Sequence, residues 1–125
     1  MEREWESEPN RKEWEHVGLK CLVLRAQHLG HLNGYVGVPE GHPAYDRDYD
    51  EIDVEVHGGL TFGDFGDGQL RPKGFYWLGF DCAHLGDFVP GQEKHGRADG
   101  TYRNMVYVTA ETEKLAEQLV AYKED

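Results

Sequence analysis

Side chains capable of acid–base chemistry or metal binding gather just after one apolar segment of the sequence. Asp81, His84 and Asp87 are spaced three apart, at the end of and directly after residues 74–82. If the chain forms a helical turn there, the three side chains lie near one face. With His57 they predict a site of two imidazoles and two carboxylates, which suits a divalent metal ion. The alternative is that Asp81 only satisfies backbone amides of its own loop.

A second set of residues is suited to binding a small polar ligand. The paired glycines Gly58 and Gly59 let a backbone approach a ligand closely and turn amides toward an anion. Tyrosines on a frame of Gly and Pro between residues 34 and 49 are typical of surfaces that stack on planar ligands. Together these segments predict one pocket, lined by Tyr35, His42, Tyr45, His57, Gly58, Gly59, Thr61, Trp77, Asp81, His84 and Arg103. The alternatives are a bend with a surface histidine, and a loop held by its own rings.

Three hypotheses of function follow from these residues. The first is a non-enzymatic protein without a cofactor that binds a small polar ligand such as a signalling nucleotide, with Arg103 or His57 on its phosphate. The second is a hydrolase in which a divalent metal, bound by His57, Asp81, His84 and Asp87, generates hydroxide. The third is an inhibitor that presents an acidic, nucleic-acid-like surface to a protein partner. The sequence identifies no catalytic residue and leaves open whether the protein is an enzyme.

The charge of the chain restricts its partners. The 125 residues include 13 Lys and Arg against 24 Asp and Glu, a net charge of −11. Binding to a nucleic-acid duplex depends on clustered Lys and Arg, so direct nucleic-acid binding is disfavoured. A phosphate ligand requires a locally positive pocket. Seven acids lie between Glu40 and Glu55 with Arg47 as their basic neighbour, a run typical of a solvated loop.

Two further features concern location and redox state. No apolar run approaches the roughly 20 residues of a membrane helix, and the acidic N-terminus lacks the pattern of a secretory signal. We therefore expect a cytoplasmic protein without membrane contact, and the sequence leaves its oligomeric state open. Cys21 and Cys82 match no metal or redox spacing, so we expect both to be reduced and buried.

The elements that position these residues predict an α+β protein with a mainly antiparallel sheet and a C-terminal helix. Residues 1–15 are predicted to form a charged arm or short helix, and residues 16–125 a single domain. Strands are predicted at residues 17–24, 35–38, 52–57 (resuming at 60–62), 74–82 and 102–108.

Three details of this prediction are specific enough to test. Asn33 and Gly34 predict a turn. Residues 74–82 have bulky apolar side chains at both odd and even positions. This pattern is typical of a central strand that is covered on both faces. Thr109 is the expected N-cap of the helix, which has Leu115, Leu119 and Tyr122 on its predicted buried side, with Ala116 and Val120 widening the apolar stripe.

Several short motifs give the chain a resemblance to small uncharacterised proteins of bacteria and bacteriophages. These motifs are GYVG at 34–37, GHP at 41–43, HGGLTF at 57–62, WLGFDCAHLGD at 77–87 and YR at 102–103. The likeness extends from about residue 34 to residue 108. It implies a phage or prophage accessory protein in the host cytoplasm, where such proteins often neutralise host defences by binding a signalling nucleotide or a defence protein.

Overall fold

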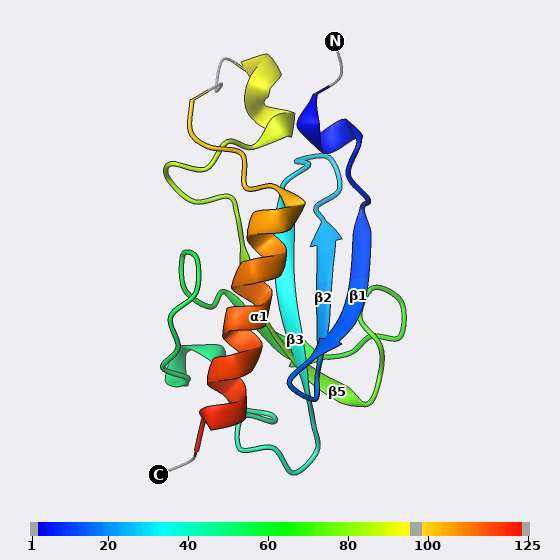
Figure 1. Cartoon of the computed structure of the whole chain (residues 1–125), viewed down its shortest axis with the longest axis vertical. Helices are drawn as coiled ribbons and strands as arrows, with labels where there is room; N and C mark the ends of the chain where they lie inside the picture. The colour runs from blue at the N-terminus through cyan, green and yellow to red at the C-terminus, as the bar shows by residue number, and fades with distance from the viewer. Residues whose placement is uncertain (1–2, 96–98, 124–125) are drawn as a thin grey trace.

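A five-stranded antiparallel sheet and one long helix dominate the computed structural model, which describes residues 3–95 and 99–123 (Figure 1). The strands β1 (Arg11–His16), β2 (Leu19–Arg25), β3 (Leu32–Pro39), β4 (Phe62–Phe65) and β5 (Phe75–Asp81) lie in the order β1-β2-β3-β5-β4. Helix α1 (Met105–Ala121) covers one face, and η1 (Glu4–Glu6), η2 (Tyr49–Glu51) and η3 (Pro90–His95) are short 3-10 helices. The predicted α+β class is confirmed. Parts of the predicted arm (1–2), loop (96–98) and domain end (124–125) lie outside the described residues.

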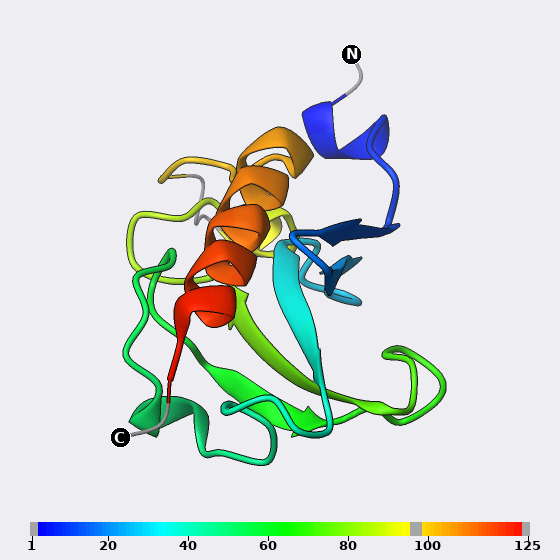
Figure 2. The ribbon, with the colours of Figure 1, turned by 60° about the horizontal axis from the view of Figure 1, so that its bottom comes forward.

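Strand β5 is the central strand that the sequence predicted. It pairs with β3 on one side and β4 on the other. Tyr76, Leu78 and Phe80 face the core under α1, whereas Trp77 packs on the opposite face with Leu22, among other residues. Figure 2 shows α1 lying over only one face of the sheet. The successive residues of β5 therefore belong to two separate cores.

Helix α1 approaches β3 closely because Gly34 has no side chain. A Cβ at Gly34 would lie 2.4 Å from Thr112 Oγ1 and 2.5 Å from the Phe80 ring. The Thr112 hydroxyl donates to the Val108 carbonyl at 2.7 Å, so the polar group at this contact is satisfied inside the core. The predicted turn at Asn33 and Gly34 is therefore wrong, because both residues lie within β3.

Helix α1 begins five residues earlier than predicted, and it takes up residues 105–108 of the predicted strand at 102–108. The N-cap is Asn104, not Thr109, and its side chain accepts a hydrogen bond from the Tyr107 amide at 2.8 Å. β-branched and aromatic residues in this stretch have high strand propensity, but their apolar spacing also continues the helical stripe. The buried side chains of α1 are Met105, Val108, Thr112, Leu115, Ala116 and Leu119.

Residues 52–57 are extended but join no sheet in the described part of the chain, so the predicted strand is wrong. Their apolar side chains do pack on the core in the predicted alternation. The backbone bonds to a helix side chain instead: the Glu55 amide donates to Gln118 Oε1 at 2.7 Å, and the Glu55 carbonyl accepts from Gln118 Nε2 at 2.7 Å. The strand expected to resume at residue 60 begins at Phe62, as β4.

The N-terminal segment belongs to the folded body. Strands β1 and β2 form an antiparallel pair and are joined by a turn at residues 17–18. The predicted arm is therefore wrong from residue 11 onward. Before β1, the Trp5 ring centroid lies 5.4 Å from that of Phe88 and 5.1 Å from that of Tyr102. Within the described residues, no helix is both long enough and apolar enough to cross a membrane.

Candidate functional site

The residues of the predicted pocket lie in three separate places. One group gathers where β5 ends and contains His57, Gly58, Gly59, Thr61, Asp81, His84 and Arg103, together with Asp87 of the predicted metal site. Tyr35 and Trp77 lie on the sheet face opposite α1. His42 and Tyr45 lie in the loop after β3, where His42 reaches the C-terminal turn of α1. The single pocket expected from the sequence therefore does not form.

Asp87 is the centre of the first group. Its side chain is 1% exposed, and it accepts hydrogen bonds from His57 Nε2 (2.8 Å), Arg103 Nε (2.8 Å) and the His84 amide (3.0 Å). Burial raises the pKa of Asp87, but these hydrogen bonds outweigh it, so its pKa lies below the ordinary value. Asp87 is therefore an ionised carboxylate that holds three segments of the chain together.

His57 has a protein partner at each ring nitrogen. Because the ionised Asp87 only accepts, His57 Nε2 carries a proton. In the neutral ring Nδ1 is then an acceptor, and the Tyr107 hydroxyl lies 2.8 Å from it. Burial, followed by the charge of Glu111, raises the pKa of Tyr107, which keeps the phenol protonated. Asp87, His57 and Tyr107 form a closed hydrogen-bonded chain with neither imidazole nitrogen free.

Asp81 satisfies its own loop, as the alternative interpretation proposed. Its carboxylate accepts from the Thr61 hydroxyl at 3.0 Å and the Ala83 amide at 3.1 Å, and His84 Nε2 lies 3.2 Å away. A Cβ on Gly58 would lie 2.2 Å from His84 Nε2, and Gly58 has φ +69°. This glycine is needed because the His84 ring packs against it in a left-handed turn.

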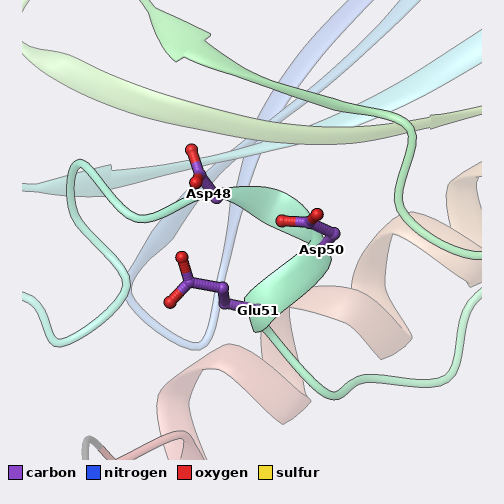
Figure 3. Close-up of side chains that lie close together, drawn as sticks. All are labelled: Asp48, Asp50 and Glu51. Carbon is purple, nitrogen blue, oxygen red and sulfur yellow. The ribbon is translucent and has the colours of Figure 1, made fainter.

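The geometry gives no support to a metal centre at these residues. In the described part of the chain, no three of His57, Asp81, His84 and Asp87 have ligand atoms within 4.8 Å of one another, whereas Asp48, Asp50 and Glu51 do. Figure 3 shows these three carboxylates on and just before η2. All three residues are exposed, and clusters of exposed acids are common without an ion.

His42 and Tyr45 hold their loop in place. The Ala44 amide donates to His42 Nδ1 at 3.0 Å, so the proton is on Nε2, which lies 2.9 Å from the Leu119 carbonyl at the end of α1. The Tyr45 ring packs on Phe65, with centroids 5.5 Å apart. The alternative interpretation, a loop held by its own rings, is therefore the one that the structure favours.

A cleft of about 410 Å³ is a site that the sequence analysis missed. It is lined by Asn10, Arg11, Leu24, Arg25, Ala26, Gln27, Asn33, Tyr35, Leu70 and Arg71. Arg11, Leu24 and Asn33 are direct cross-strand neighbours on β1, β2 and β3. The wall contains three arginines and no Asp or Glu, and two of these arginines have ion-pair partners outside it, Arg11 with Glu13 at 3.2 Å and Arg25 with Glu8 at 3.4 Å. We refer to it as the arginine cleft.

Arg71 is the least satisfied of the three arginines. Its guanidinium carbon lies 4.3 Å from the Phe62 ring centroid and 5.3 Å from that of Tyr35. The side chain is 13% exposed, and its ion-pair partner Asp67 is 3.9 Å away. Arg71 Nε is buried and has no hydrogen-bond partner within the described residues. The rings therefore orient a desolvated cation that lacks a close anion.

The other two arginines fix the walls of the cleft. Arg25 Nε donates to Asn10 Oδ1 at 2.8 Å, and its Nη1 donates to the Gly30 carbonyl at 2.8 Å. Arg11 Nη1 donates to the Leu70 carbonyl at 2.7 Å, which joins β1 to the loop that carries Arg71. These bonds hold both walls of the cleft in position.

Comparison with known proteins adds no independent assignment: no family model, curated protein or solved structure matches the chain.

Proposed function

We propose that the protein is a non-enzymatic binding protein that holds a small anionic ligand in the arginine cleft. The observation that carries this proposal is Arg71, a charged side chain that is 13% exposed with no carboxylate closer than 3.9 Å in the described part of the chain. Burying a charge without a close partner is costly. A phosphate or carboxylate group on a ligand would supply the missing acceptor.

The geometry of Arg71 suits a phosphate or carboxylate. Arginine presents its donors in a planar fork that pairs with such groups through two parallel hydrogen bonds. Stacking on Phe62 and Tyr35 limits the rotation of the guanidinium, so less freedom is lost when a ligand binds. The bond from Arg11 to Leu70 preorganises the opposite wall in the same way.

In this proposal the cluster around Asp87 stabilises the fold and does not bind the ligand. Asp87 and His57 already have protein partners at the polar atoms that a ligand would need.

The likeness to phage accessory proteins supports a counter-defence setting, in which the protein would sequester a signalling molecule of the host. That setting rests on the resemblance alone.

Isothermal titration calorimetry at low salt tests the proposal. We expect pyrophosphate, or one of a panel of linear and cyclic nucleotides, to bind the wild-type protein, and Arg71→Gln to weaken binding at least tenfold. Arg71→Lys, which keeps the charge but not the fork, should lie between the two. Arg3→Gln is the matched control, since it removes the same charge from an exposed position outside the cleft.

Two results would refute this function. One is the absence of binding across the whole panel. The other is an affinity that both Arg71 variants leave unchanged while their thermal unfolding remains cooperative.

A further inference from the structure

We infer that the ligand of the arginine cleft is a nucleotide. Its nucleobase would form hydrogen bonds with amide side chains of the cleft, and its phosphate would pair with Arg71. This inference rests on the proposed function and adds a second recognition element to it.

The size of the cleft points to an organic ligand. Its volume of about 410 Å³ lies within the usual range for pockets that hold small organic molecules. A water molecule takes up roughly 30 Å³ in the liquid. Because a phosphate ion is only a few times larger than a water molecule, a free phosphate would leave most of the cleft unfilled. Leu24 and Leu70 give the wall apolar surface as well, which a plain inorganic anion would not use.

The amide side chains on the wall match the edges of a nucleobase. Asn10, Gln27 and Asn33 all line the cleft. Each carboxamide carries both a donor and an acceptor, and asparagine and glutamine pair with base edges for that reason. Asn10 Oδ1 already accepts from Arg25, which leaves Gln27 and Asn33 as the residues that would recognise the base.

Asn33 supplies the most specific observation. Its Oδ1 is buried and has no hydrogen-bond partner within the described residues. Asp81, the next residue in the cross-strand row, is engaged by Thr61 and Ala83 and provides no donor. An unpartnered buried acceptor costs about 1–3 kcal/mol. The exocyclic amine or ring N–H of a base would supply the missing donor, and fully ionised pyrophosphate has none. Ribose 5-phosphate offers hydroxyl donors, so it is the comparison that isolates the contribution of the base.

Tyr35 lies beside both recognition elements. Its ring centroid lies 5.3 Å from the Arg71 guanidinium carbon, and it follows Asn33 by two residues on the same face of β3. The residue therefore joins the arginine that would hold the phosphate to the amide that would hold the base. The two groups of one nucleotide would bind at adjacent positions on the wall.

Calorimetry with pyrophosphate, ribose 5-phosphate, nucleosides and the corresponding mononucleotides tests this inference. We expect at least one mononucleotide to bind tenfold or more tightly than ribose 5-phosphate. Asn33→Leu, which removes the polar group, should abolish that difference, while ribose 5-phosphate still binds in a manner that depends on Arg71. Gln27→Ala, at an exposed position on the rim, is a second variant in case Asn33→Leu does not fold.

The outcomes separate this inference from the proposed function. If ribose 5-phosphate and every mononucleotide bind equally and both depend on Arg71, the nucleotide assignment is wrong and the anion site stands. A preference for nucleotides that survives in both amide variants also overturns it. If no anion binds at all, the proposed function itself fails.

Discussion

His31 shows how a single buried side chain makes the stability of this protein depend on pH. The residue is 6% exposed, and its Nδ1 has no hydrogen-bond partner within the described residues. Burial lowers its pKa from 6.5, although the nearby carboxylates Asp81 and Asp87 act in the opposite direction. The folded protein therefore keeps His31 neutral at a pH at which the unfolded chain begins to take up the proton.

We expect the free energy of unfolding to fall as pH decreases below about 6.5, because the unfolded state then binds a proton that the folded state excludes. The contribution is complete above pH 6.5 and is lost as pH falls toward the lower pKa of the folded protein. One such proton changes the free energy of unfolding by up to about 1.4 kcal/mol per pH unit. Urea unfolding at pH 7.5 and 5.5 measures this change in the free energy of unfolding.

His31→Leu should remove this part of the pH dependence. His28→Asn is the matched control, since His28 is exposed and asparagine tolerates its positive φ of 68°. If wild type and His31→Leu lose the same stability between the two pH values, burial of His31 is not the cause.

At the scale of elements, Gln118 provides backbone hydrogen bonds to residues 52–57 that a neighbouring strand would otherwise provide. Its carboxamide both donates to and accepts from the backbone of Glu55. The His57 amide is held similarly, by Glu111 Oε1 at 2.8 Å. Two side chains on one face of α1 therefore replace a ladder of backbone hydrogen bonds, and they bring His57 to Asp87.

We expect Gln118→Ala to lower the free energy of unfolding by about 1–2 kcal/mol, because two backbone hydrogen bonds are lost at a partly buried position. Hydrogen exchange at the Glu55 amide should become faster, by a larger factor than at amides of β3. Val120→Ala, at a 53% exposed position of the same helix, should change the free energy by less than about 0.5 kcal/mol. Unchanged exchange at Glu55 would show that another contact holds the segment.

At the scale of the whole molecule, the two cysteines report on global unfolding. Both thiols are free and buried, as the sequence predicted, with exposed fractions of 2% for Cys21 and 1% for Cys82. Burial raises the pKa of each thiol to about 12. Cys21 lies on β2 and Cys82 follows β5 directly, and both side chains belong to the core between the sheet and α1.

We expect neither thiol to react with a disulfide reagent at pH 8 in the native protein, and both to react once denaturant unfolds it. The thiolate is the reactive species, and burial disfavours it. Ser7→Cys, at an exposed position, is the positive control and should react at once. Rapid modification of Cys21 or Cys82 without denaturant would contradict the burial described above.

Much of the fold could be predicted from local pattern. The apolar run at 74–82 identified β5, and the spacing of Leu115 and Leu119 identified the buried side of α1. The start of the helix was missed because residues 102–108 have strand propensity. Tyr107 and Glu111 are spaced four apart on α1, and this helical spacing is the signal that would have added Tyr107 to the site.

The candidate site was predictable only in part. Sequence alone predicted that this chain forms strands and a C-terminal helix. It grouped His57, Asp81 and Arg103 in one pocket, but it placed Trp77 and His42 there too, and these lie elsewhere. Tertiary structure decided which face of β5 meets the helix, and this placed Trp77 away from His57. It also brought together arginines from residues 11, 25 and 71. The physical reason is that periodicity is a property of neighbouring residues, whereas strand order and the choice of covered face depend on cooperative packing of the whole chain.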